Sequence, residues 1–353
     1  MLILVINPGS TSTKIAVYDD AKPIMLRSIA HTAEELNQFE EVTDQFQFRK
    51  QIVIDELRRM DIPFEFKAVI GRGGLAKPLE GGVYEINQQM LEDVRQAIHK
   101  HACDLGCIIA HEIAQEIPNC RSFIADPGVV DELNDYARIS GSPQMPRICI
   151  WHALNQRAIA RRFANEIGRK YEDLNLIICH MGGGISVAAH KGGRAVDANN
   201  ALDGEGPFSP ERAGSLPAAD LIRLCFSGEY TEQQLLKRIA GKAGLTAHSG
   251  TNNMKELEKR IANGDEHAQL VVDAMIYHVA KAIAAESAVL CGKIDAILLT
   301  GGMARSEYVI KRLRKRIDFL APTYCYPGED EMGALASNAL DVLRGKVKAK
   351  EYS

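Results

Sequence analysis

One pattern occurs twice in the sequence: a short apolar strand, a polar turn containing glycine, and a second strand. The first copy spans Leu2–Tyr18 around the turn Asn7–Lys14, and the second spans Leu176–Ala189 around the turn His180–Gly184. Short β-rich runs on either side of such a turn predict β-hairpins. Two hairpins about half a chain apart indicate two related domains that face each other across a cleft.

Strand and helix patterns alternate along the rest of the chain, which predicts an α/β architecture. Apolar strands are expected at 68–70, 122–125 and 296–299, and a long helix at about 266–290. With 353 residues the chain has the length of two domains.

No low-complexity linker marks the domain boundary, so we place it by pattern near Arg147–Trp151. One domain is expected to comprise 1–150 together with 331–353, because a last helix can pack back on the first half. The other domain is expected to comprise 151–330.

Composition indicates a globular protein of a reducing compartment. Hydrophobic residues make up 46% and charged residues 25%, and the net charge of −4 argues against nucleic acid as a partner. Eight cysteines are scattered without a Cys-x-x-Cys pair. The apolar start is too short for a signal peptide, and no apolar run is expected to reach the roughly 18 residues of a membrane helix. We therefore expect a cytoplasmic protein that does not enter a membrane.

Three glycine-containing turns follow apolar strands, at Asn7–Lys14, His180–Gly184 and Thr300–Gly302. Glycine lets backbone N–H groups approach an anion, and hydroxyl groups add donors. The first turn has hydroxyl residues at every position from Ser10 to Thr13. An ordinary polar turn is the alternative for each one, but three at strand ends favour nucleotide phosphates. The common nucleotide-binding loops and the serine-hydrolase elbow are absent from the sequence.

Charged residues near these turns are candidates for chemistry. Arg72 and Arg212 lie among small or turn-forming residues, and a planar guanidinium suits the oxygens of a transferring phosphoryl group; a surface salt bridge is the alternative. Asp126 ends a strand at a Pro-Gly break, where it either acts in the site or caps the next segment. His152 is a site residue or a buried structural histidine. Glu329-Asp330-Glu331 opens the last helix, where acids favour the helix dipole whether or not they bind Mg²⁺.

In this order the motifs resemble the acetokinase family, and most closely its branch of butyrate-phosphorylating enzymes. The segments that carry the resemblance are Asn7-Pro-Gly-Ser-Thr-Ser-Thr-Lys14, Gly71-Arg-Gly-Gly74, Asp126-Pro-Gly-Val-Val-Asp-Glu132, His152-Ala-Leu-Asn-Gln156, His180-Met-Gly-Gly-Gly184 and Ser209-Pro-Glu-Arg-Ala-Gly214. The resemblance implies two duplicated actin-like (ribonuclease H-like) domains around a nucleotide cleft. It also implies reversible phosphoryl transfer between ATP and a short-chain fatty acid, with butyrate first, and a homo-oligomer.

For catalysis the resemblance implies that Asp126 orients metal and phosphate, and that His152 and Arg212 stabilise the in-line transition state. Arg72 stands where acetate kinases carry a histidine, so the resemblance leaves open whether Arg72 replaces the family's substrate arginine. Another active-site histidine of the family aligns with either His99 or His101, and the sequence does not choose between them. A fatty acid is already ionised at neutral pH, so its attack on phosphorus needs no general base.

ATP or ADP and Mg²⁺ are the implied cofactors. The implied nucleotide and phosphate contacts are Asn7, Ser10, Ser12, Lys14, His180, Gly182, Gly183, Gly184, Gly301 and Gly302. The implied metal contacts are Asn7 with Asp330 or Glu331.

Other functions remain open at the level of sequence. Isobutyrate, isovalerate or propionate are alternative acceptors, because one methylene discriminates by only ~1–3 kcal/mol. A sugar kinase of the same superfold would need a base, and Asp126 is available for that role. A nucleotide-binding regulator or filament former is the non-enzymatic alternative, although the chain shows no room before its first hairpin for a DNA-reading helix pair.

Overall fold

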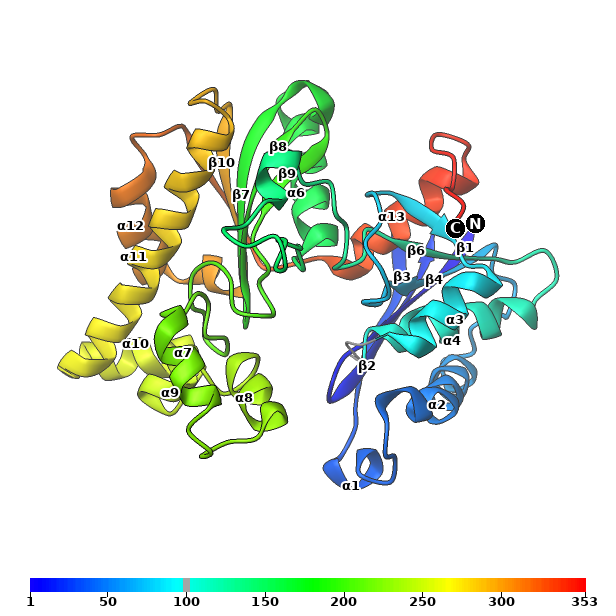
Figure 1. Ribbon diagram of the computed structural model, residues 1–353. Coiled ribbons are helices and arrows are strands. Elements are labelled where there is room, and N and C mark those ends of the chain that lie inside the picture. Colours follow the sequence, from blue (N-terminus) through cyan, green and yellow to red (C-terminus); the bar gives the residue numbers. More distant parts are fainter. Residues whose placement is uncertain (98–101) are drawn as a thin grey trace. The chain divides into compact units, whose positions relative to one another are not determined.

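The computed structural model describes residues 1–97 and 102–353, so His99 and His101 lie outside the described residues. The chain divides into two compact units (Figure 1). The N-terminal unit comprises Met1–Val130 and Asp330–Ser353, and the C-terminal unit comprises Asp131–Glu329.

The N-terminal unit is built on a six-stranded sheet of order β3-β2-β1-β4-β6-β5. The first three strands form an antiparallel meander, β4 and β6 run parallel to β1, and β5 pairs antiparallel with β6. The strands are β1 (Leu2–Pro8), β2 (Ser12–Asp19), β3 (Lys22–Ala30), β4 (Ala68–Arg72), β5 (Val83–Glu85) and β6 (Arg121–Ala125).

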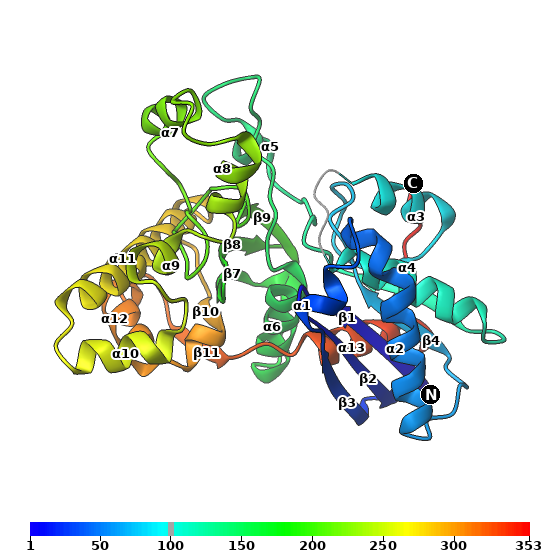
Figure 2. The same cartoon turned by 90° about the horizontal axis from the view of Figure 1, so that it is seen from below.

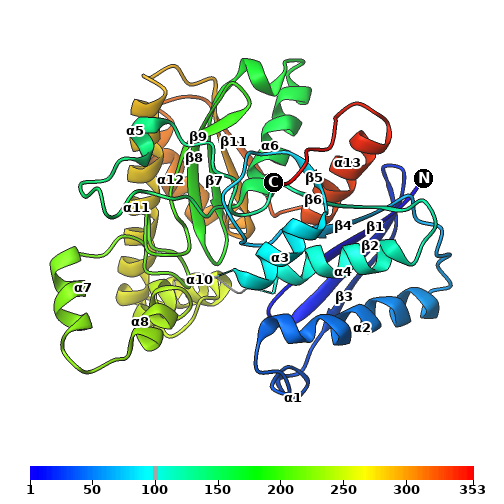
Figure 3. The ribbon, with the colours of Figure 1, turned by 45° about the vertical axis from the view of Figure 1, so that its right-hand side comes forward.

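Helices cover both faces of this sheet, because alternate residues of its central strands are buried on opposite sides. Leu4 and Ile6 of β1 share a core with α2 and α4, while α13 packs on β1 and β4 from the other side (Figure 3). The helices of this unit are α1 (Ala33–Leu36), the 3₁₀ turn η1 (Val42–Gln45), α2 (Phe46–Arg59), α3 (Gln88–Gln96), α4 (Asp104–Gln115) and α13 (Glu331–Leu343).

The C-terminal unit has a five-stranded sheet of order β11-β10-β7-β8-β9 (Figure 2). Its strands are β7 (Asn175–Met181), β8 (Ile185–Lys191), β9 (Arg194–Ala198), β10 (Ala296–Gly301) and β11 (Thr323–Pro327). Its helices are α5 (Asp135–Arg138), α6 (Ala153–Glu166), η2 (Tyr171–Asp173), α7 (Ala218–Cys225), α8 (Glu232–Ile239), α9 (Gly244–Ser249), α10 (Met254–Ala262), α11 (Glu266–Val289), η3 (Gly302–Arg305) and α12 (Glu307–Ile317).

The two sheets repeat one topology, and the predicted fold class is confirmed. In each, an antiparallel three-strand meander is followed by two strands parallel to its first member: β3-β2-β1-β4-β6 and β9-β8-β7-β10-β11. The two predicted hairpins are β1–β2 and β7–β8.

Residues 131–150 lie with the C-terminal unit, although the predicted boundary near residue 150 assigned them to the other domain. The N–H of Asn134 donates to the Val196 carbonyl, and Arg147 pairs with Asp197 and Glu205. These partners lie far along the sequence, so local composition carries no sign of the attachment.

Helix α11 is long and apolar enough to cross a membrane by length and composition, contrary to the expectation that no such run exists. Val272, Met275 and Ile283 on this helix are buried in the core of the C-terminal unit against β7 and β8. Its apolar character is therefore that of a core helix.

Candidate active site

The segment Gly9–Thr13 joins β1 to β2 and includes the first two residues of β2; it is called the first turn. The Gly9 N–H donates to the Ser12 carbonyl at 2.7 Å and closes the turn. Ser10 and Thr11 are exposed at its tip, and their backbone N–H groups donate to no acceptor in the described part of the chain. Lys14 follows on β2, exposed and opposite Asn7 in the register. Free N–H and hydroxyl donors of this kind suit an anion.

Three predicted site residues meet at the start of α13. The Asn7 side chain donates from Nδ2 to Glu331 Oε2 at 2.6 Å, and Arg72 forms an ion pair with the same carboxylate. Asp330 instead caps α13 by accepting from the Gly333 N–H at 2.8 Å. The structure therefore separates the two acids: Glu331 faces Asn7, and Asp330 stabilises the helix.

A Mg²⁺ ion at this place would meet one carboxylate, that of Glu331, whose oxygens already contact Asn7 and Arg72. Mg²⁺ in proteins is usually held by one or two carboxylates together with water and phosphate oxygens. No group of three His, Cys, Asp or Glu side chains suited to a metal exists within residues 1–97 and 102–353. A single carboxylate beside an amide is thus compatible with an ion brought in with nucleotide phosphates.

Asp126 lies at the same edge of the sheet, because β1, β4 and β6 are parallel neighbours. Its side chain is 0% exposed and accepts at Oδ1 from the Gly82 N–H at 2.7 Å. Its φ of 40° is unusual for a residue other than glycine, which points to a position fixed by its surroundings. Asn7 near the end of β1, Arg72 at the end of β4 and Asp126 directly after β6 therefore lie at the carboxyl ends of three adjacent strands.

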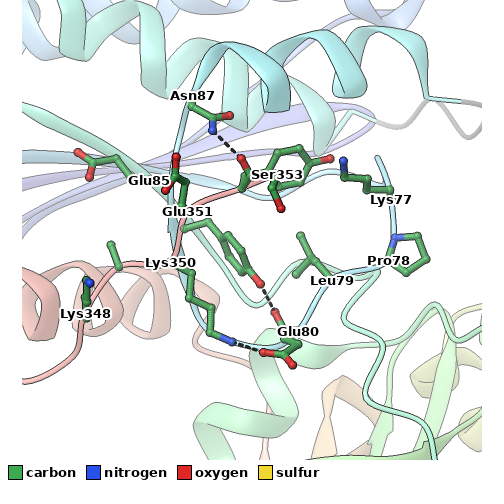
Figure 4. Close-up of a pocket in the computed structure, with 13 residues that line it drawn as sticks. Lys77, Pro78, Leu79, Glu80, Glu85, Asn87, Lys348, Lys350, Glu351 and Ser353 are labelled. Atoms are coloured by element: carbon green, nitrogen blue, oxygen red, sulfur yellow. Dashed lines mark hydrogen bonds and ion pairs between the residues drawn. The ribbon is translucent and has the colours of Figure 1, made fainter. Parts of the chain in front are cut away.

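The loop that contains Gly82, whose N–H contacts Asp126, is held in place by the last residues of the chain, including Lys350 and Tyr352. Lys350 pairs with Glu80 at 2.9 Å, and the Asn87 side chain donates to the Tyr352 carbonyl at 2.7 Å (Figure 4). These residues line a hollow of about 1000 Å³ that contains none of the predicted site residues. We interpret this hollow as part of the contact between the loop and the C-terminal residues, and not as a ligand site.

In the C-terminal unit, two predicted histidines stack. The rings of His152 and His180 are 3.8 Å apart between centroids and inclined by 9°. The His180 Nδ1 lies 2.9 Å from the Asn155 Oδ1, which only accepts, so this nitrogen carries a proton. Its Nε2 lies 3.6 Å from a carboxylate oxygen of Glu329.

A buried network sets the tautomer of His152. The Ser186 hydroxyl accepts from the Gln156 Nε2 at 2.9 Å and from the His152 N–H at 3.3 Å, so its own proton points to the His152 Nδ1 at 2.8 Å. The neutral His152 ring then carries its proton on Nε2. His190 orients Gln156 in turn, since its Nε2 lies 3.0 Å from the Gln156 Oε1. Burial lowers the pKa of His190 to about 3.

The turn Gly182–Gly184 is called the second turn, and Arg212 lies directly against it. A Cβ on Gly184 would come within 2.4 Å of the Arg212 Nη1, so only glycine leaves room for the guanidinium. Arg212 donates from Nη1 to the Ala201 carbonyl at 2.7 Å, and burial lowers its pKa although an arginine remains charged. The Ser209 hydroxyl donates to the Gly183 carbonyl at 2.6 Å and anchors the turn.

Gly301 is the last residue of β10, which pairs with β7, and Gly302 begins η3 directly after it. Gly301 has φ of 89°, and a Cβ there would lie 2.5 Å from the Met181 carbonyl oxygen. A Cβ on Gly302 would meet nothing within 4 Å in the described residues. Gly301 therefore serves close strand packing, whereas Gly302 faces open space.

Sequence reasoning missed Ser186 and Gln156, which orient His152, and Arg49, which contacts the first turn. Gln156 lies within a quoted motif, and its spacing of four residues from His152 on a helix was an available signal. Nothing local marked Arg49, because its contacts lie about forty residues away in the chain.

Comparisons with known proteins identify the family. The model of the acetokinase family matches residues 149–321. The chain is 63% identical over 352 residues to a probable butyrate kinase of Bacteroides thetaiotaomicron, with all of both chains covered. It is 51% identical to butyrate kinase 1 of Clostridium acetobutylicum, with 99% of both covered. The crystal structure of Porphyromonas gingivalis acetate kinase aligns with a TM-score of 0.79 at 19% identity, over 97% of this chain and 99% of that one. The chain belongs to the acetokinase family.

Proposed function

We propose that this protein is an ATP-dependent kinase that converts butyrate and ATP reversibly to butyryl phosphate and ADP. The observation that carries the proposal is full-length similarity, at 63% and 51% identity, to proteins named for butyrate phosphorylation. The duplicated fold and the anion-suited turns in both units support it.

In the proposed reaction a carboxylate oxygen of butyrate attacks the γ-phosphorus of ATP. The new O–P bond forms as the bond from that phosphorus to the bridging oxygen breaks, and the electron pair leaves with ADP. Because butyrate is already an anion, catalysis consists of alignment and charge neutralisation. We assign Arg212 and the Nε2–H of His152 to the phosphoryl oxygens, and Arg72 to the carboxylate or the phosphoryl group.

The remaining assignments follow the same chemistry. Asn7, Ser10, Ser12 and Lys14 would contact the transferring phosphate, and Asp126 would orient it. His180, the second turn and Gly301–Gly302 would bind the nucleotide. Mg²⁺, held by Glu331 and Asn7, would neutralise charge on the nucleotide phosphates. A cytoplasmic location and a homo-oligomer belong to the proposal, and all eight cysteines being free is consistent with a reducing compartment.

The test is hydroxylamine-trapped acyl phosphate formation with ATP and Mg²⁺, measured across acetate, propionate, butyrate, isobutyrate, isovalerate and valerate. We expect kcat/KM to peak at butyrate. A peak at a branched acid or at propionate would retain the acyl kinase and change its substrate. No product with any acid, in a folded protein, would refute the proposed function.

A further inference from the structure

Arg49 lies near the N-terminal end of α2. It is a fully buried arginine whose side chain contacts the first turn, Gly9–Thr13. Its side chain is 0% exposed. The Nη1 group donates to the Gly9 carbonyl at 2.8 Å, the Ser12 carbonyl at 3.1 Å and the Thr13 hydroxyl at 3.1 Å. The Nη2 group adds the Ser10 carbonyl at 3.4 Å. One guanidinium thus reaches most of the turn.

The charge of Arg49 has no carboxylate partner within 4.0 Å in the described part of the chain. Its remaining hydrogen bonds go to the neutral Oε1 of Gln45, at 3.1 and 2.9 Å. The next residue, Lys50, is also buried but pairs with Glu112 and Glu116. A buried charge without a partner is costly, so its retention calls for an anion from outside the chain.

These contacts also set the direction of the backbone N–H groups. The peptide bonds of the turn are trans, so the C=O of one residue and the N–H of the next point in opposite directions. With the Gly9 and Ser10 carbonyls drawn to Arg49, the N–H groups of Ser10 and Thr11 face away from it. Those are the two N–H groups that lack an acceptor in the described residues.

We propose that Arg49 is the positioning residue of the first turn, and that its uncompensated charge is completed by the phosphoryl group bound on the turn's outer side. Arg49 does not touch the substrate; it holds the donors in place and adds positive potential through the turn. The inference rests on the proposed function for the identity of the phosphoryl group. Nearby, burial and the charge of Arg49 lower the pKa of His31, so this imidazole adds no second charge at neutral pH.

Gln45→Glu tests the charge without disturbing the geometry. The substitution keeps the acceptor oxygen of Gln45 and supplies the missing carboxylate. We expect Gln45→Glu to melt no lower than the wild type, because a buried charge gains a partner. At the same time kcat/KM for butyryl phosphate should fall about tenfold, since the positive potential is neutralised. A purely structural arginine predicts no loss of activity in a variant whose stability is kept.

Gln47→Glu is the matched control, because it adds the same charge at an exposed position of α2. It should change kcat/KM by less than about twofold. Calorimetric binding of inorganic phosphate measures the same effect without turnover, so it decides the role of Arg49 even if the wild type phosphorylates no acid. Weaker phosphate binding by Gln45→Glu alone supports the inference. Unchanged binding, equal weakening by Gln47→Glu, or a less stable Gln45→Glu protein would overturn it.

Discussion

The first and second turns occupy equivalent places in the two sheets, yet they are built differently. The first turn, Gly9–Thr13, contains hydroxyl side chains and is held by a buried guanidinium, that of Arg49. The second turn, Gly182–Gly184, has no side chains of its own and lies against Arg212. Duplication conserved the strand order, while each unit obtained its positive charge from a different element.

The two turns therefore differ in the substitutions that they tolerate. In the first turn the Arg49 guanidinium lies behind the backbone and holds it by hydrogen bonds to carbonyl groups. In the second turn the cation lies beside the backbone, where an added atom would displace it. The following substitutions test this contrast.

The largest effect is expected from Arg212→Ala. Loss of a guanidinium that contacts the transferring phosphoryl group should lower kcat about 1,000-fold, with a much smaller change in KM for ATP. Steady-state kinetics of hydroxamate formation measures both. Arg223→Ala is the control, since this exposed arginine pairs only with Asp220 among the described residues. A variant with unchanged kcat and weaker ATP binding would remove Arg212 from the transition state.

Alanine substitutions in the two turns should lower kcat by very different amounts. Gly184→Ala places a Cβ about where the Arg212 guanidinium lies, and we expect kcat to fall roughly 100-fold as the arginine moves. Gly9→Ala should cost less than about threefold, because a Cβ there would lie 3.5 Å from its nearest neighbour, an ordinary contact. Equal losses at both positions would break the contrast between the turns.

Ser186→Ala should release the His152 ring. Without the hydroxyl, the ring proton can move from Nε2 to Nδ1, so we expect kcat to fall about tenfold. The melting temperature distinguishes this from a packing defect, because loss of the tautomer alone leaves it unchanged. Ser249→Ala is the control, because that buried hydroxyl has no hydrogen-bond partner in the described residues. A loss of kcat that accompanies a lower melting temperature would leave Ser186 a packing role.

The smallest effect concerns stability alone. Burial, with Asp197 nearby, raises the pKa of Glu286 on α11 to about 8. Because the folded pKa lies above the unfolded value, ionisation opposes folding, and the free energy of unfolding should fall as pH rises from about 4.5 through 8. Glu286→Gln should remove this fall and gain at least about 1 kcal/mol at pH 8.5, measured by urea unfolding. Glu266→Gln, at an exposed position of the same helix, leaves Glu286 in place and should keep the wild-type fall. An unchanged slope in Glu286→Gln would refute the assignment.

Much of the fold was predictable from local patterns. The two hairpins and their turns follow from short-range alternation. The sheet then places Asn7, Arg72 and Asp126 at the carboxyl ends of adjacent strands. What sequence could not supply depends on contacts between distant segments. The choice between Asp330 and Glu331 is made by helix capping and by Asn7, and Arg49 on an ordinary amphipathic helix gives no sign of the turn it contacts.

The return of Asp330–Ser353 to the N-terminal unit has a consequence for biosynthesis. On the ribosome the C-terminal unit, which is continuous in sequence, has all of its residues before the N-terminal unit does. The earlier-made strands must wait for α13, and with it for Glu331, so the first part of the chain to be translated is the last to be completed. The order of translation thus delays the contacts of Asn7 and Arg72 with Glu331 until α13 has been made.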